Sequence, residues 1–147
     1  MSTPSMWKFR ASLFAFILAA APLSPALHAQ DTDEAVIVNV PFAFHNGSQH
    51  LAAGLYTIRL EGQNVLEIRG EKAAGLALVL FDENSRPSNT TKVVFLKYGD
   101  QYFLQEVWVA GQTRHTYCLP TKAEKLEMAA NKATPTGVEV AALEMPR

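Results

Sequence analysis

The sequence predicts an all-β protein, a small antiparallel β-sandwich or partly closed barrel of about six or seven strands with a C-terminal α-helix. Three observations predict this class. After residue 35, apolar and polar residues alternate with a period of two, as in strands with one buried face. Turn residues, such as Gly62-Gln63-Asn64 and Gly99-Asp100, separate these runs. Behind the leader, only residues 121–133 combine a capping motif with a run of helix-forming residues.

Residues 1–29 are expected to be a secretory signal peptide. Lys8 and Arg10 precede an apolar run over residues 11–21 that is too short to span a bilayer, and small residues lead to a cleavage site after Ala29. An uncleaved anchor is the alternative. We therefore expect an exported protein, periplasmic or extracellular, with no transmembrane segment after cleavage and with residues 30–34 as a short acidic lead.

The 147 residues leave room for one domain behind the leader, which we place at residues 35–133. The net charge is −1, and the leader holds basic but no acidic residues, so the remainder is mildly acidic. This balance argues against a nucleic-acid partner. Cys118 is the only cysteine, so the fold must depend on its hydrophobic core instead of an internal disulfide. We expect a buried, inert thiol, with a disulfide to another chain as the alternative.

The first half of the domain is predicted to contain three strands. Residues 36–44 place valines at 36, 38 and 40 on one face, and Pro41 indicates an edge or a bulge. Residues 45–54 have the composition of a turn. Residues 55–61 and 65–70 then form a hairpin, in which Leu66 and Ile68 face inward while Glu67 and Arg69 face water.

A different pattern follows at residues 75–81, where GLALVLF is apolar on both faces of the predicted strand. Such a strand belongs in the centre of a sheet or beneath a covering element. The longest polar connection comes next, at residues 82–91.

The strongest predicted hairpin spans residues 92–109, because Gly99 at the first central position suits a type II′ turn. The simplest register pairs Lys97 with Tyr102 and Val94 with Gln105. Both faces of the hairpin are mostly apolar in that register. A sheet with one dry and one wet face does not explain this pattern, so we expect something to cover the second face.

The C-terminal helix is predicted at about residues 121–133, where Thr121 and Glu124 match a capping box. Its apolar stripe is thin, so it would cover only part of the second face of the hairpin. Residues 134–147 show little periodicity and are expected to form a flexible tail.

The aromatic residues of the hairpin are the best candidates for a ligand or partner site. In the simplest register Phe95, Tyr102 and Trp108 share a face with Glu106, where flat rings could stack on a sugar or an apolar ligand. The alternative is that these rings are core residues and cross-strand pairs. Glu106 is either a general acid or, in the preferred interpretation, a carboxylate that pairs with a base or reaches solvent.

Other chemistries have weaker support in the sequence. His45, His50, His115 and Cys118 lack the paired spacings of zinc sites, so neither a metal site nor a cofactor is predicted. The serines at 48, 85 and 88 lie in polar turns, and His115 and Cys118 are poorly spaced for a thiolate and its base. No catalytic residue is predicted, and the sequence favours a protein without enzymatic activity over an enzyme.

Two blocks of the chain resemble a known group of proteins: VPFAFHNGSQHLAAGLYTI at 40–58, and KVVFLKYGDQYFLQEVWVAG followed by LPTKAEKLEMA at 92–129. The group consists of small exported proteins with signal peptides that are abundant in acidobacteria. Its members carry a V-P-F-x-F strand, an L-P-A-G-x-Y turn and strand, an aromatic hairpin with Tyr, Phe and Trp, and a charged helix. Ala52 stands where the group usually has Pro. The resemblance implies an envelope location and a compact β-domain, and it carries over no catalytic residue.

Three functions follow, in order of preference. The first is an exported, non-catalytic β-domain that acts as a structural or interaction module of the cell envelope, bound to an envelope protein or to a second copy of itself. The second is a small-molecule binding protein that holds an apolar or sugar-like ligand at Phe95, Tyr102 and Trp108. The third is a hydrolytic enzyme that uses Glu106 or His115.

Overall fold

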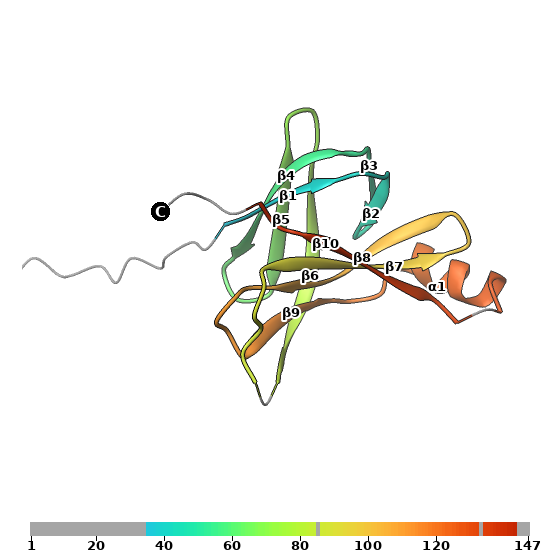
Figure 1. Ribbon diagram of the computed structural model, residues 1–147. Helices are drawn as coiled ribbons and strands as arrows, with labels where there is room; N and C mark the ends of the chain where they lie inside the picture. Colours follow the sequence, from blue (N-terminus) through green and yellow to red (C-terminus); the bar gives the residue numbers. More distant parts are fainter. Residues whose placement is uncertain (1–34, 85, 133, 144–147) are drawn as a thin grey trace, which may run out of the picture. The chain divides into compact units, whose positions relative to one another are not determined.

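A computed structural model describes residues 35–84, 86–132 and 134–143 of the chain (Figure 1). The predicted signal peptide and acidic lead therefore lie outside the described residues. The described part contains ten strands and one α-helix near its C-terminal end, which confirms the all-β class with a C-terminal helix. The number of strands is higher than the predicted six or seven. Within these residues, no helix is both long and apolar enough to cross a membrane.

Four strands form one end of the sheet, all of them antiparallel. β1 (Val36–Val40) pairs with β4 (Gly54–Glu61), β4 with β5 (Val65–Gly70), and β5 with β6 (Ala74–Glu83). The predicted alternation is confirmed here: Leu66 and Ile68 are buried, whereas Arg69 is exposed. We call the face of the sheet that contains the core the inner face, and the opposite face the outer face.

The sheet continues from β6 through β9 (Arg114–Cys118), β8 (Gln101–Trp108) and β7 (Lys92–Tyr98) to β10 (Thr136–Ala141). A short hairpin of β2 (Phe44–Asn46) and β3 (Gln49–Leu51) lies in the tract that was predicted to be only a turn. β2 runs parallel to the first half of β8, where His45 pairs with Phe103. β6 lies between two strands, as its doubly apolar sequence predicted.

The two end strands of this path approach each other. Val38 of β1 forms a single bridge with Ala142, and the Leu143 N–H donates to the Ile37 carbonyl at 2.7 Å. The sheet thus curls around one core without closing into a continuous ladder.

Residues 134–147 were predicted to form a flexible tail, and β10 corrects this prediction for residues 136–141, whereas residues 144–147 lie outside the described residues. Residues 136–141 pair with all but the last residue of β7, and Val138 and Val140 pack against the core. The alternation in this segment is too short to stand out in the sequence. It forms a strand because β7 offers it an unpaired edge, and because two valines spaced by two residues reach the core together.

The β7–β8 hairpin has the predicted turn, with Gly99 at φ 56° in the left-handed region that a type II′ turn requires. The predicted register holds as far as Phe95 opposite Leu104. Beyond that pair, Val94 lies opposite Glu106 instead of Gln105, because β8 contains a β-bulge.

The bulge changes which residues share a face. One extra residue in β8 reverses the alternation beyond it, so Val107 turns inward and is buried in the core. Glu106 and Trp108 turn to the outer face instead. The simplest register was therefore wrong for the second half of β8, and the predicted common face of Phe95 and Trp108 does not form.

Helix α1 (Lys122–Ala130) begins as predicted and ends about one turn earlier than residue 133. The Glu124 N–H donates to the Thr121 hydroxyl at 3.2 Å, and the Glu124 carboxylate accepts from the Thr121 N–H, so the capping box is confirmed. Glu124 also shares a hydrogen bond with Tyr98, and Asn131 lies beside Gly99. The helix thus covers the tips of β7 and β8 and leaves the outer face of β6 open (Figure 1).

Candidate functional site

Phe95 and Tyr102, two of the four predicted site residues, lie on the inner face. Phe95 is 0 % exposed and makes T-shaped contacts with Phe42 and Phe44, both with ring centroids 5.2 Å apart. Tyr102 stacks on Phe42 with centroids 3.9 Å apart. These contacts belong to the packed core, and they leave no free ring surface on Phe95 for a ligand.

Glu106 and Trp108, the other two, lie on the outer face and bind each other. The Trp108 Nε1 donates to the Glu106 carboxylate at 2.6 Å, and the indole lies parallel to the His115 ring at 3.8 Å. The Lys92 ammonium lies 5.7 Å from the centroid of the Trp108 ring. The structure therefore separates the four predicted residues into a core pair and an outer-face pair. All three partners of the indole, Glu106, His115 and Lys92, come from its own sheet.

The histidines and Cys118 do not gather at one place: His45 and His50 lie together on β2 and β3, with ring centroids 4.8 Å apart, whereas His115 and Cys118 lie on β9. The His45 Nε2 lies 2.9 Å from the Gln101 side-chain oxygen, and His115 is held on the outer face by Trp108. Cys118 is buried, and this burial raises the pKa of its thiol to about 12, so the thiol is protonated at neutral pH. Within the described residues, no three His, Cys, Asp or Glu side chains gather as metal ligands.

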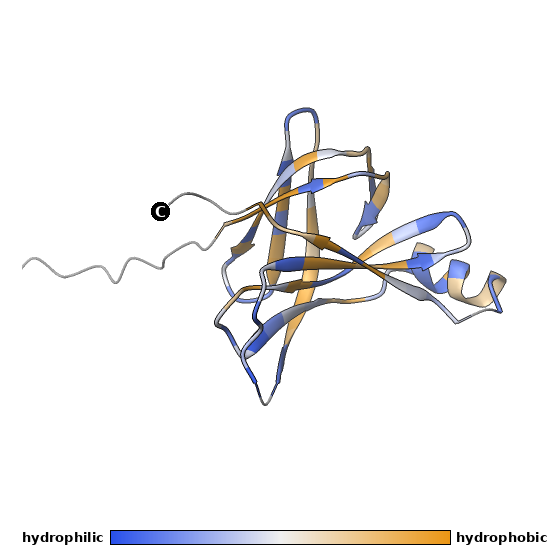
Figure 2. Cartoon of the chain, in the orientation of Figure 1, coloured by the Kyte–Doolittle hydropathy of each residue, from blue (hydrophilic) through white to orange (hydrophobic). Residues whose placement is uncertain are grey.

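An apolar surface that the sequence indicated but did not locate lies on the outer face of β6 and β9. Leu76, Leu78 and Leu80 are 61, 62 and 49 % exposed, and Leu119 beside Leu78 is also exposed. We call these four residues the leucine face. Figure 2 shows the nearly continuous hydrophobic run along β6 from which it arises. The sequence placed this strand in the centre of a sheet or beneath a covering element, and within the described residues it is central while its outer leucines are exposed.

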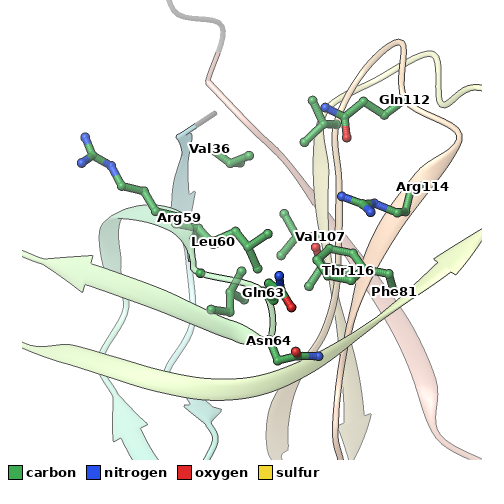
Figure 3. Close-up of a pocket in the computed structure, with 14 residues that line it drawn as sticks. Val36, Arg59, Leu60, Gln63, Asn64, Phe81, Val107, Gln112, Arg114 and Thr116 are labelled. Carbon is green, nitrogen blue, oxygen red and sulfur yellow. The ribbon is translucent and has the colours of Figure 1, made fainter. Parts of the chain in front are cut away.

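A cavity on the inner face is the second candidate, and no motif in the sequence announced it. It has a volume of about 740 Å³ and lies beside the β4–β5 turn and the loop between β8 and β9 (Figure 3). Aliphatic side chains of β1, β4, β5 and β8, together with Phe81 of β6, form the apolar part of its walls, and Thr116 of β9 adds a hydroxyl group. The aliphatic side chains of the cavity include Ile58, Leu60, Val107 and Val109.

The cavity exists because the two halves of the interior are filled differently. Aromatic rings, Phe42, Phe44, Phe95 and Tyr102, fill the half next to β2 and β7. The other half is lined by aliphatic side chains that reach less far, and Leu60 and Val109 there are only partly buried. The remaining space is large enough for a small ligand.

Polar groups surround the opening of this cavity. Arg114 of β9 extends its guanidinium over the Phe81 ring, 4.1 Å from the ring centroid. Asn64 is held by a hydrogen bond from its side-chain amide to the Val79 carbonyl at 3.2 Å. Gln63 and Gln112 complete the polar rim, whereas Arg59 points away (Figure 3).

Comparison of the chain with protein-family models, with curated proteins and with solved structures finds no match. The leucine face and the cavity are therefore the two features from which a function can be argued.

Proposed function

We propose that this protein is an exported, non-catalytic β-domain that associates with a second copy of itself through the leucine face. The observation that carries the proposal is the row of three outward leucines, each about half exposed or more, on a strand inside the sheet. Soluble domains rarely leave such a continuous apolar row in water unless it binds something. Burying one leucine side chain stabilises a complex by about 1.5–3 kcal/mol.

The arrangement of the leucine face favours a second copy as the partner. Leu76, Leu78 and Leu80 are evenly spaced along β6, so a two-fold axis at Leu78 would place Leu76 of one copy against Leu80 of the other. Two flat sheet faces pack on each other in this way in β-sandwiches.

The surroundings of the leucine face resemble the polar rim of an interface. On the neighbouring strand β5, Glu67 pairs in register with Leu76 and accepts a hydrogen bond from Arg69 at 2.6 Å. On the other side, Glu106 lies beyond Tyr117. An apolar centre between charged strands is the usual organisation of protein interfaces.

Export and the absence of catalysis belong to the same proposal. Export is supported by the basic and apolar leader at residues 8–21. A non-catalytic role is supported by the contacts of the two strongest enzyme candidates, because Glu106 and His115 both engage Trp108. The resemblance to exported acidobacterial proteins stays a prediction.

The test is the molar mass of the purified protein in solution, measured by sedimentation equilibrium for the natural chain and for two variants. Leu78→Glu places a charge at the centre of the leucine face, whereas Leu55→Glu makes the same change at a 56 % exposed leucine on β4 outside it. We expect two chains for the natural protein and for Leu55→Glu, and one chain for Leu78→Glu.

A natural chain that sediments as a monomer, or a Leu55→Glu variant that dissociates equally, would overturn the proposal. So would a stable complex with a different protein when the chain is isolated from its host, because the leucine face would then have another occupant. Circular dichroism of both variants shows whether the strands are intact.

A further inference from the structure

We propose that the inner-face cavity binds a small amphipathic molecule with an apolar body and one anionic head group, with Arg114 as the counter-ion. The cavity and the leucine face lie on opposite faces of the sheet, so this inference does not depend on self-association.

The walls of the cavity determine the apolar part of the ligand. Ile58, Leu60, Val107 and Val109 present only hydrocarbon to the space, and the volume of about 740 Å³ falls within the range of small-molecule sites. Because each CH₂ group that is buried against hydrocarbon stabilises a complex further, an alkyl or alicyclic body gains most from this wall.

Arg114 determines the charge of the head group. Its guanidinium extends toward the cavity from β9 and lies on the Phe81 ring, which holds the side chain in place (Figure 3). The ion pairs within the described residues join Arg69 to Glu67 and Lys92 to Glu139, and neither involves Arg114. Its cross-strand neighbour Glu83 is exposed.

A guanidinium fixed above an apolar wall matches a carboxylate best. Arginine binds a carboxylate through two parallel N–H donors, and the bond strengthens where water is partly excluded. The side-chain amide of Gln63 adds a neutral donor at the same rim. A sugar fits less well, because Arg114 covers one side of Phe81, the one aromatic ring that lines the cavity.

The test uses octanoate and octan-1-ol, which share an eight-carbon body and differ in charge. Each is titrated into the purified protein while NMR follows the methyl signals of Leu60, Val107 and Val109. We expect both to shift these signals and octanoate to bind at least about tenfold more tightly, as a charge-assisted hydrogen bond in a partly buried site allows.

Three variants separate the roles of the cavity and of Arg114. Arg114→Gln should bind octan-1-ol unchanged and lose the preference for octanoate. Arg69→Gln, the matched control on the outer face, should behave as the natural protein does. Val109→Trp fills the opening and should weaken both probes.

Two results would overturn the inference. If neither probe shifts the methyl signals, the cavity is not a binding site for apolar molecules. If both bind equally, or if Arg114→Gln keeps its preference for octanoate, the cavity takes apolar ligands but Arg114 is not the counter-ion.

Discussion

Glu124 is the buried carboxyl group among the described residues, and the contacts of its carboxylate explain this position. It closes the capping box of α1 through the Thr121 backbone and contacts Tyr98 of β7, so a single side chain joins the helix to the sheet. Burial raises the pKa of Glu124, and the hydrogen bonds from Thr121 and Tyr98 oppose that change only in part. The ionised form is therefore less favourable in the folded chain than in the unfolded one.

This shift in the pKa of Glu124 predicts a pH-dependent stability. Because the folded pKa lies above the unfolded one, the contribution of Glu124 is complete below its unfolded pKa and is lost as the pH rises through the folded pKa. Glu124→Gln keeps an acceptor for the capping box but carries no charge. We expect the variant to match the natural protein near pH 3 and to be the more stable one at pH 7.

Urea denaturation across this pH range measures the difference in the free energy of unfolding. Glu71→Gln, which removes an exposed carboxylate in the β5–β6 turn, is the matched control for the same change at the surface. A Glu124→Gln variant that is equally destabilised at both pH values would show that its carboxylate acts only as a hydrogen-bond acceptor.

At the scale of elements, β10 is a short strand whose loss should strongly lower the stability of the fold. It pairs with β7 along six positions and contributes Val138 and Val140 to the core. It also joins the two ends of the curled sheet through the residues just beyond it. A change that detaches β10 therefore exposes both a strand edge and the core.

Val140→Asp is expected to lower the free energy of unfolding by about 2–3 kcal/mol, because it places a charge against the core. Glu139→Gln removes only the exposed ion pair with Lys92 and should change stability by no more than about 1 kcal/mol. Denaturant unfolding measures both values, and amide exchange of β7 reports whether its edge has opened. Equal effects of the two changes would mean that β10 adds no core contacts.

The elements that the sequence could predict are those whose pattern is local. The alternation around Leu66 and Ile68, the glycine at position 99 and the capping box at Thr121 each depend on a few neighbouring residues. The bulge at Gln105 has no local signature, because it is defined only against the partner strand β7. β10 depends in the same way on a distant edge.

The candidate sites also differ in whether a local pattern in the sequence could predict them. The leucine face was visible as the doubly apolar run at residues 75–81, although the sequence did not show which of its residues would be left in water. The cavity could not be predicted, because it results from how far side chains of six strands reach into one interior. Trp108 was predicted as a site residue because of its aromatic ring. No pattern in the sequence distinguished Arg114, the residue to which we assign ligand recognition.

For the whole molecule, one core ties distant segments together. The same cluster contains Val38 from the first strand and Phe95 and Val107 from the hairpin, and Val140 from the last strand packs on it. Such a domain should unfold in one cooperative step, and its many long-range pairings should slow refolding to about milliseconds to seconds.

This cooperativity can be checked by following urea unfolding with far-UV circular dichroism and with the methyl signals of Val38 and Val140. We expect coincident transitions. An earlier loss of the Val140 signal would show that the β7–β10 ladder opens as a separate unit.

The contacts between β1 and the two residues that follow β10, Ala142 and Leu143, have a further consequence. Since the Leu143 N–H donates to the Ile37 carbonyl, the end of the described residues lies close to the start of β1 at Val36, and a short peptide could join the two without shortening either strand. The backbone could then be opened in the exposed turn at residues 71–73. The strands would follow one another in a rotated order around the same interior, so the fold should tolerate circular permutation.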